Sequence, residues 1–389
     1  MIKIIRNGQV YGPEPLGRKD VLVVGERFAS VGEAIQGAFP DGVPVEVIDA
    51  TGLCVFPGFI DGHVHIIGGG GEGSYHTRTP EIVLSSLVRA GITTVIGCLG
   101  TDGITRTMAA LYAKAKGLEE EGVSAYILTG SYRVPIATLT GDPMRDIMFI
   151  DLVVGTGEIA LSDHRSAQPT LEEIRRLAAD IRVGAILAGK AGVMNVHLGD
   201  GASGLGMLRE IVAGTELPYA QFLPTHVNRN ERLFQESIDY ALAGGFIDLT
   251  ATSGPLGETG DLTAGAGLKR CLERGVPAER ITFSSDGQGS LPVFNERQEM
   301  VRMGVGQVSD LYREVRDAIR AGVPVESALR TITRNPAEIY GLKRKGRIRS
   351  GFDADLVLVD AATLDIDTVI ARGRTLMQGG QVKVAGTFE

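Results

Sequence analysis

The sequence is short of cysteine, of net positive charge and of long apolar runs. Its three cysteines are far apart and show no C-x-x-C spacing, which argues against a disulfide framework and against a thiolate zinc site. The chain carries 39 Lys and Arg against 47 Asp and Glu, a formal net charge of -8, so binding to nucleic acid is not expected. No uninterrupted apolar run of ~18 residues occurs, so neither a membrane span nor a membrane partner is expected.

The N-terminus also lacks a targeting signal. Residues 1–11 carry charges and alternate between polar and apolar, which is the pattern of a strand and not of a signal peptide. With so few cysteines, this predicts a cytoplasmic protein. The 389 residues are 43% apolar and 22% charged, which is typical of a globular protein of about two domains, although one barrel can take ~250 residues alone.

The two ends of the chain differ from its middle. Residues 1–56 hold short alternating runs, such as Ile2 to Ile5, punctuated by Gly and Pro, and residues 354–384 repeat that pattern. Both segments predict short antiparallel strands. We expect residues 1–56 and 344–389 to join into one small β domain beside a central domain of residues 57–343.

The middle of the chain alternates apolar runs bounded by Gly with helical patterns, which favours parallel βα units. The eight runs end near His65, Gly97, Thr129, Leu161, His197, His226, Thr250 and Asp286. Their spacing of roughly 30 residues fits a (β/α)8 barrel. A doubly wound sheet is the structural rival, because alternation of strands and helices does not separate the two folds.

Helical patterns lie between these runs. The first is expected over residues 80–89, with Thr79 as its N-cap and Pro80 as its first residue. Others cover residues 107–121, 171–182 and 232–243.

Four of the six histidines stand at the ends of predicted strands. His63 and His65 close the first strand, and side chains two apart on a strand point to the same side. An H-x-H pair alone is explained as well by chance as by metal binding. However, His197 and His226 end two later runs, where barrel enzymes place catalytic groups. Packing is a poor explanation for four histidines in one layer.

Asp286 ends the last predicted strand. A lone Asp there is usually a turn or cap residue, but beside four histidines we interpret it as a ligand and general base. Nitrogen and oxygen ligands suit Zn²⁺, with Mn²⁺, Co²⁺ or Fe²⁺ as alternatives. Such a metal acidifies bound water and polarises a carbonyl, and Asp286 is placed to pass the water's proton to a leaving amine. The sequence therefore predicts a metal-dependent hydrolase.

This ligand pattern resembles that of the amidohydrolase superfamily, and Gly351 to Val357 is similar to a segment of its small β-sandwich domain. Runs at Gly68 to Glu72, Ser162 to Arg165 and His226 to Asn230 resemble bacterial isoaspartyl (β-aspartyl) dipeptidases, over essentially the whole chain. The resemblance implies a TIM barrel with a small β-sandwich domain formed by both chain ends. It also implies β-aspartyl dipeptides as substrates and assembly into a homo-oligomer.

The resemblance further implies residues that hold the aspartyl part of the substrate. Glu72 matches the residue that pairs with the α-amino group. Thr101 matches a residue that contacts the α-carboxylate, with backbone near Gly70. Ser290 is similar to a further substrate contact. Taken singly, each of these residues has an alternative interpretation as an ordinary loop residue.

The same resemblance assigns the leaving side of the substrate. Arg165 and Arg229 match the cations that hold the C-terminal carboxylate, for which a guanidinium has a suitable two-pronged geometry. Tyr132 matches a residue that hydrogen-bonds the oxyanion beside the metal. We interpret Asp163 and His164 as residues that support the site or the fold.

Glu158 departs from the family. The best-known members bridge two metals with a carbamylated lysine, and the matching position here is Glu158. A glutamate carboxyl group lies closer to its own backbone, but the run Gly155 to Gly157 is one residue longer than the family pattern, which would move the backbone inward as a bulge does. We expect Glu158 to bridge two zinc ions, independently of bicarbonate. The alternative is a loop carboxylate beside one metal or a weak second one.

Two competing functions stay open from the sequence. A cyclic amide hydrolase, of the dihydropyrimidinase or dihydroorotase kind, shares the metal ligands but not Glu72, Arg165 and Arg229. A catalytically inactive scaffold would be expected to lack metal ligands, and only the Glu158 position leaves room for that interpretation.

Overall fold

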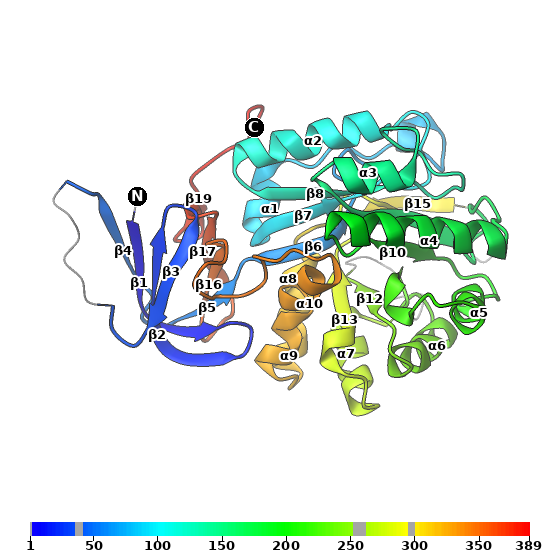
Figure 1. Ribbon diagram of the computed structural model, residues 1–389. Helices are drawn as coiled ribbons and strands as arrows, with labels where there is room; N and C mark the ends of the chain where they lie inside the picture. Colours follow the sequence, from blue (N-terminus) through cyan, green and yellow to red (C-terminus); the bar gives the residue numbers. More distant parts are fainter. Residues whose placement is uncertain (1, 36–41, 252–261, 295–299) are drawn as a thin grey trace.

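The computed structural model describes residues 2–35, 42–251, 262–294 and 300–389. Figure 1 shows two parts side by side: a sheet in which the blue N-terminal and red C-terminal strands lie together, and a barrel formed by the rest of the chain. The predicted division at residues 56 and 343 stays a prediction.

Strands from both chain ends form one nine-stranded mixed sheet, in the order β19-β18-β17-β16-β5-β1-β2-β3 with β4 beside β1. The two ends meet where β16 runs antiparallel to β5. The predicted antiparallel pairing is wrong for β1–β4 and β1–β5, which are parallel. The strands are β1 (Ile2–Tyr11), β2 (Pro15–Val24), β3 (Arg27–Gly32), β4 (Val45–Asp49), β5 (Leu53–Pro57), β16 (Leu356–Asp360), β17 (Ile366–Ala371), β18 (Arg374–Gln378) and β19 (Gln381–Val382).

Parallel strands with helices outside them make the second part. Strands β6 to β11 form one sheet in sequence order, and β12 pairs with β13. The ring closes where Val227 N donates to Asp248 O at 3.4 Å and where His65 N donates to Gly287 O at 2.9 Å. The strands are β6 (Phe59–Val64), β7 (Ile92–Gly97), β8 (Ser124–Thr129), β9 (Val153–Leu161), β10 (Val193–Leu198), β11 (Phe222–Thr225), β12 (Ile247–Thr250) and β13 (Ile281–Ser284). The predicted (β/α)8 barrel is confirmed, and the doubly wound sheet is wrong.

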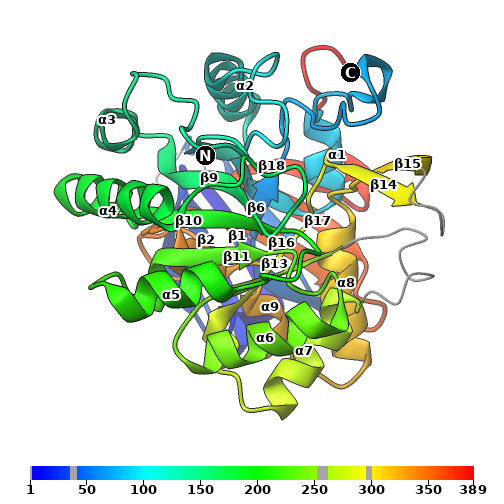
Figure 2. The same ribbon diagram turned by 90° about the vertical axis from the view of Figure 1, so that its right-hand side faces the viewer.

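Helices surround the barrel strands, with the sheet of the chain ends behind them in Figure 2. They are α1 (Leu84–Arg89), α2 (Met108–Glu121), α3 (Pro143–Phe149), α4 (Leu171–Ala188), α5 (Gly206–Gly214), α6 (Glu231–Leu242), α7 (Ala264–Glu273), α8 (Asp310–Arg320), α9 (Val325–Arg330) and α10 (Arg334–Ile339). A hairpin of β14 (Ser290–Phe294) and β15 (Met300–Val305) precedes α8. Among the described helices, none has the length and apolar content needed to cross a bilayer.

Helix α4 shows why these segments are helical and where they dock. Thr170 and Glu173 form a capping box at its start, and Gly189 ends it in the left-handed conformation. Buried residues such as Ile174, Leu177 and Ile181 recur every three or four positions, so one stripe of the helix packs on the barrel.

The first predicted helix begins later than expected. Helix α1 starts at Leu84, and Thr79 caps nothing. The Thr79 hydroxyl instead accepts a hydrogen bond from Gly69 N at 2.7 Å and donates to Gln288 O at 2.5 Å. Tertiary contacts therefore override the local capping signal and tie the glycine loop to the segment after β13.

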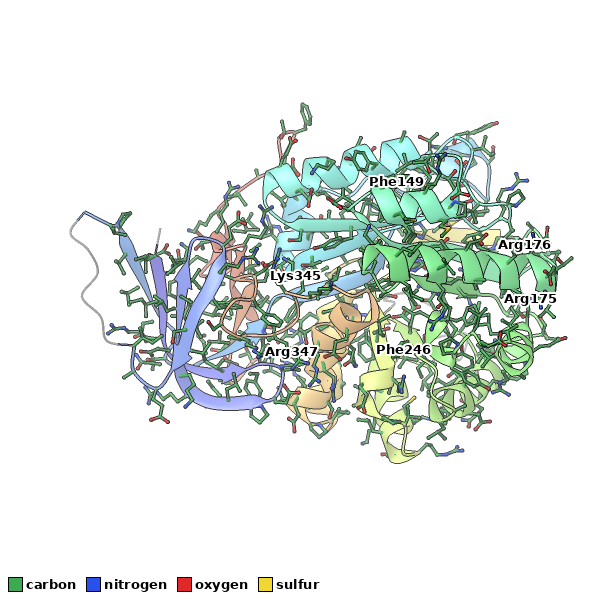
Figure 3. All side chains as sticks on the ribbon, viewed as in Figure 1. Phe149, Arg175, Arg176, Phe246, Lys345 and Arg347 are labelled. Carbon is green, nitrogen blue, oxygen red and sulfur yellow. The ribbon has the colours of Figure 1, made fainter. Side chains whose placement is uncertain are left out.

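A buried lysine joins the two parts of the molecule. Lys345, labelled in Figure 3, lies between the sheet of the chain ends and the barrel. Its Nζ is 2.6 Å from Asp355 Oδ2 and 2.9 Å from Asp353 Oδ2, and it donates to Ser124 Oγ in β8 at 2.7 Å. Two carboxylates balance this buried charge, so removal of the carboxylates would leave it uncompensated.

Candidate metal centre

The predicted ligands converge at the carboxyl ends of the barrel strands. Each lies on a strand or just after one, and all are buried except Asp286, whose side chain is 14% exposed: His63, His65, Glu158, His197, His226 and Asp286. The barrel brings together side chains that are up to 223 positions apart (63 to 286), because the parallel strands all end at the same rim.

Glu158 lies at the centre of the four histidines. Its Oε1 is 3.4 Å from His65 Nε2. Its Oε2 is 3.1 Å from His197 Nδ1, 3.3 Å from His63 Nε2 and 3.6 Å from His226 Nε2. Glu158 therefore reaches both His63 and His65 at the end of one strand and His197 and His226 at the ends of two others, although its side chain is shorter than that of a carbamylated lysine.

A bulge in β9 accounts for this reach. Thr156 pairs with Met194 and Ile159 with Val196, so Gly157 and Glu158 together oppose Asn195. This extra residue is the bulge that the long glycine run predicts. Gly157 has φ 138°, and a Cβ there would lie 2.6 Å from Asn195 O, so only glycine fits.

Gly157→Ala is therefore expected to destabilise the protein by at least about 2 kcal/mol, from the positive φ and the clash with Asn195 O, and to reduce bound zinc. Urea unfolding and metal analysis measure both effects. Gly117→Ala is the matched control, since no atom lies within 4 Å of a Cβ there and alanine in a helix interior stabilises by about 0.5–1 kcal/mol. Equal stability of the two variants would contradict the bulge argument.

Contacts on the outer side of each histidine decide which nitrogen faces inward. His63 Nδ1 is 3.2 Å from Asn195 Oδ1, and His226 Nδ1 is 2.7 Å from Thr250 Oγ1, so both rings present Nε2 to the cluster. His197 is reversed: its Nε2 is 2.9 Å from Asp163 Oδ2, and its Nδ1 faces Glu158. Such outer partners fix the ring orientation of metal-binding histidines.

The donor set fits a divalent metal. Asp286 Oδ1 is 3.1 Å from His65 Nε2 and 3.9 Å from His63 Nε2. Asp286 Oδ1 and His63 Nε2 are buried, yet neither makes a hydrogen bond with any residue that the structure describes. Buried polar atoms normally find a partner, and imidazole nitrogens with carboxylate oxygens are the ligands that zinc accepts.

The protonation states of the cluster are mixed. Burial lowers the pKa of His63 and His65, but Cys98 together with Glu158 or Asp286 outweighs burial and holds both pKa values well above the ordinary value, so a metal has to displace a proton from these two rings. Burial raises the pKa of the Glu158 carboxyl, but His63, His197 and His226 outweigh it and hold that pKa well below its ordinary value. Burial also raises the pKa of the Asp286 carboxyl, but the neighbouring histidines outweigh burial and lower that pKa to about 2. Burial lowers the pKa of His226 to about 3. Ionised carboxylates and a neutral imidazole are the forms that bind metal.

Cys98 is a member of the cluster that the sequence analysis missed. It follows β7, and its Sγ is 3.9 Å from His65 Nδ1. The thiol, His63, His65 and Glu158 form one group of close ligand atoms, and Glu158, His197 and His226 form another. Cys98 faces the outer nitrogen of His65 and so contacts this predicted ligand on the side away from Glu158. The only sequence signal for it is its position at the end of a strand.

Tyr132 lies at the edge of the cluster. Its hydroxyl is 2.9 Å from His197 Nδ1, and the Arg165 guanidinium lies over its ring, 5.5 Å from the centroid. Burial and the nearby Glu158 raise its pKa well above its ordinary value, so the phenol keeps its proton and can donate a hydrogen bond.

Glu72 gathers most of the residues predicted to hold substrate. Thr101 Oγ1 donates to its Oε1 at 3.0 Å, and Ser290 Oγ donates to its Oε2 at 2.9 Å. Arg165 Nη1 is 3.4 Å from Oε1. Gly70 adjoins them, since a Cβ there would lie 3.3 Å from Ser290 Cβ. The structure thus brings these predicted residues into one cluster.

Arg106 holds the glycine loop that leads to Glu72, and no sequence pattern indicated it. It is buried, and its Nη2 donates to Gly69 O at 3.0 Å and to Thr79 O at 2.9 Å. Its Nη1 donates to Ile67 O. One guanidinium therefore satisfies three carbonyl groups of the loop.

The two predicted carboxylate-binding arginines differ. Arg165 directs Nε and Nη2 at the Asp163 carboxylate, at 3.0 and 2.7 Å, so one edge of its fork is already occupied. Arg229 follows His226, and its buried Nε finds no hydrogen-bond partner within the described ranges. Arg229 is the freer of the two cations.

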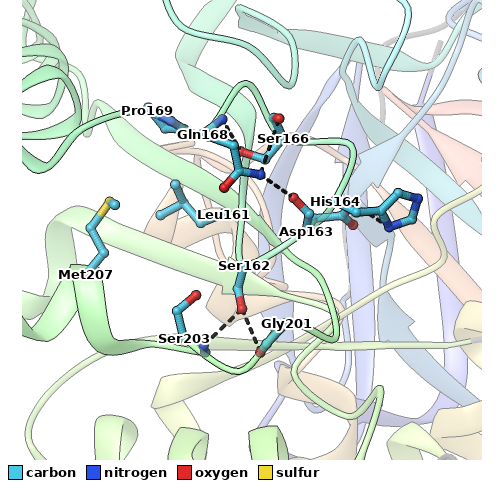
Figure 4. A pocket seen from close by; sticks show the side chains of 11 residues that line it. Leu161, Ser162, Asp163, His164, Ser166, Gln168, Pro169, Gly201, Ser203 and Met207 are labelled. Atoms are coloured by element: carbon cyan, nitrogen blue, oxygen red, sulfur yellow. Dashed lines mark hydrogen bonds and ion pairs between the residues drawn. The ribbon is translucent and has the colours of Figure 1, made fainter.

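A cavity of about 330 Å³ lies behind the Asp163 loop (Figure 4). Ser162 Oγ closes one wall by donating to Gly201 O at 2.7 Å, and Gln168 Nε2 donates to Asp163 O at 2.9 Å. Leu161 and Met207 give it an apolar side. None of the six predicted metal ligands lines it, but Asp163, which does, is 2.9 Å from His197 Nε2, so the cavity adjoins the metal centre.

Comparison with known proteins gives this site a family. The amidohydrolase family matches residues 46–97 and 262–382. The β-aspartyl dipeptidase of the thermophilic, keratin-degrading Fervidobacterium islandicum AW-1, solved with the dipeptide β-Asp-Leu, has 48% sequence identity and a TM-score of 0.91 over 98% of this chain and 99% of that chain. The chain belongs to the β-aspartyl dipeptidase family. The resemblance drawn from the sequence is confirmed.

Other amidohydrolases are more distant relatives of this β-aspartyl dipeptidase family member. A D-hydantoinase (dihydropyrimidinase) from Thermus sp. has 18% identity and a TM-score of 0.67 over 99% of this chain and 97% of that chain, which shows the fold alone. The adenine deaminase of Ruegeria sp. (strain TM1040) is 24% identical over 98% of this chain, and the match spans only 58% of that protein.

Proposed function

We propose that this chain is a metallo-dipeptidase that hydrolyses β-aspartyl dipeptides. The observation that carries the proposal is the position of Glu72, held by Thr101 and Ser290 and 3.4 Å from Arg165. Such a substrate has a free α-amino group and two carboxylates. A site with a carboxylate beside an arginine complements these charges. Dihydrouracil carries no charge, and dihydroorotate carries a carboxylate but no amine for Glu72 to bind.

We also propose two zinc ions per chain, bridged by Glu158 and not by a carbamylated lysine. The two groups of close ligand atoms share Glu158, which supports a bridge. Lys190 Nζ, in the segment before β10, is engaged elsewhere, because it donates to Ile150 O and Val153 O at 2.7 and 2.9 Å. When bound, zinc lowers the pKa of water and polarises the carbonyl of the scissile bond.

The side chains then have separate tasks in the proposed reaction. Asp286 accepts a proton from the attacking water and returns it to the leaving amine. Tyr132 donates a hydrogen bond to the developing oxyanion. Arg165 and Arg229 hold the carboxylate of the leaving residue.

The aspartyl half of the substrate is held by a second group of residues, which adjoins the first because Glu72 is 3.4 Å from Arg165. Glu72 binds the α-amino group through charge-assisted hydrogen bonds. Thr101, Ser290 and the backbone near Gly70 bind the α-carboxylate. Orientation by both halves brings the β-amide carbonyl to the cluster.

Glu72→Gln tests this assignment. We expect the KM for β-Asp-Leu to rise roughly 10- to 100-fold, because a hydrogen bond to a charged group contributes about 1.5–3 kcal/mol. Glu72→Gln should also show a smaller preference for β-Asp-Leu over its N-acetyl derivative than the wild type does. Steady-state kinetics measure both. Glu81→Gln, at a carboxylate that is 59% exposed, is the control, and unchanged kinetics in Glu72→Gln would remove Glu72 from the site.

An assay of several substrates separates the proposed function from its rivals. Purified protein is incubated with β-Asp-Leu, dihydrouracil and dihydroorotate. The proposal predicts hydrolysis of β-Asp-Leu alone. Hydrolysis of either ring without the dipeptide would favour a cyclic amide hydrolase, and no hydrolysis by zinc-loaded protein would favour a scaffold.

We further propose that the protein works in the cytoplasm as a homo-oligomer. The three cysteines, Cys54, Cys98 and Cys271, are buried and free, which suits a reducing compartment. Light scattering of the purified protein measures its assembly state directly.

A further inference from the structure

Asp163 lies between His197 of the metal centre and Arg165, and the proposed reaction gives it no task. It follows β9, and its side chain is 4% exposed. Its Oδ2 is 2.9 Å from His197 Nε2 and 2.7 Å from Arg165 Nη2, while Oδ1 accepts from Arg165 Nε at 3.0 Å and from Arg165 N at 2.7 Å. One buried carboxylate therefore contacts two functional side chains.

The first consequence concerns His197. A neutral imidazole that offers one nitrogen to a metal carries its proton on the other. With Asp163 accepting that proton at Nε2, the lone pair stays on Nδ1, which faces Glu158 Oε2 at 3.1 Å. His63 and His226 rely on neutral oxygens of Asn195 and Thr250.

The second consequence concerns Arg165. Two parallel hydrogen bonds to one carboxylate fix the plane of the guanidinium. The remaining Nη1 then points at Glu72 Oε1, 3.4 Å away, and the Tyr132 ring lies against the guanidinium. Arg165 is thus held between Asp163 and Glu72, with Nη1 on the part of its guanidinium that Asp163 does not occupy.

We propose that Asp163 is a positioning residue that braces both the ligand His197 and the substrate-binding Arg165. Retention of the second metal and preference for a leaving residue with a free carboxylate then depend on the same side chain. This inference rests on the proposed function for its Arg165 half, whereas its His197 half concerns metal binding alone.

Two substitutions separate the halves. Asp163→Ala removes both contacts, so we expect metal affinity at the group of Glu158, His197 and His226 to fall about 10- to 100-fold. Asp163→Asn can keep an oxygen at the Oδ2 position for His197, but its amide nitrogen would then face Arg165 Nε. We expect it to bind zinc within about threefold of wild type and to raise the KM for β-Asp-Leu about 10-fold, with kcat within about threefold.

The control is His164→Ala. The His164 side chain is 77% exposed, and its Nδ1 is 3.6 Å from Asp163 Oδ1. It neighbours Asp163 in sequence but is not part of the proposed machinery. Zinc binding and kinetics like those of the wild type are expected for this variant.

The experiment titrates zinc away from each full-length protein with a chelator and then compares β-Asp-Leu with its C-terminal amide as substrates. The inference predicts early loss of one zinc in Asp163→Ala, and in Asp163→Asn a reduced preference for the acid over the amide. Wild-type zinc retention in Asp163→Ala, or wild-type preference in Asp163→Asn, would overturn the corresponding half. If Asp163→Ala does not fold, Asp163→Asn decides, because its changed KM with intact zinc is not expected of a merely structural residue. If the wild type does not cleave β-Asp-Leu, the proposed function fails while the zinc titration still tests the His197 half.

Discussion

Asp286→Asn is expected to lower kcat for β-Asp-Leu by about 10²- to 10⁴-fold, the usual contribution of a general base. The amide keeps the shape of the carboxylate and one oxygen near His65 Nε2, which is 3.1 Å from Oδ1 in the native chain, but it accepts no proton. The fold and bound zinc should persist. Turnover at saturating zinc, metal content and thermal unfolding together measure this.

A control and a contradicting result are both available for Asp286. Asp200→Asn changes an exposed carboxylate in the loop after β10 and should leave turnover unchanged. Activity of Asp286→Asn within a few-fold of wild type would show that another group moves the proton. Loss of zinc in the same variant would instead make Asp286 chiefly a ligand.

Glu158→Ala is expected to have the second large effect. Glu158 contacts all four histidines, at 3.1 to 3.6 Å, so its removal should cost at least one zinc per chain. Loss of metal polarisation is worth several kcal/mol, or about 10³-fold in kcat/KM. Glu210→Gln, on the exposed side of α5, is the control. Metal analysis and kinetics on the same sample give the result.

A direct glutamate bridge also predicts that bicarbonate is irrelevant. A carbamylated lysine forms from carbon dioxide, whereas Glu158 carries its carboxylate permanently. Wild-type activity should therefore be the same in buffer freed of carbon dioxide and in buffer with added bicarbonate. An activity that depends on bicarbonate would contradict the bridge.

Much of the barrel and the gathering of the histidines at its rim could be predicted, because parallel strands leave a strong local pattern. Apolar runs that end in a polar residue marked the rim, and His197 and His226 both lie where that pattern put them. The bulge at Gly157 could also be predicted, since a glycine inside a strand often marks a bulge.

The contacts that depend on loops packing against one another could not be predicted. The pairing of Asp163 with Arg165 and His197 depends on how the chain turns after β9. The role of Arg106 as a donor to three carbonyls leaves no trace in spacing. Thr79 was misassigned because a helix cap is a local signal, and its actual partners, Gly69 and Gln288, come from separate loops.

Zinc titration of metal-free protein, with β-Asp-Leu hydrolysis followed in the same samples, tests the account most directly. The account predicts that activity rises until two zinc ions are bound per chain and then stays level, without added bicarbonate. Full activity at one zinc per chain would contradict the Glu158 bridge. No hydrolysis of β-Asp-Leu with two zinc ions bound would contradict the proposed function itself.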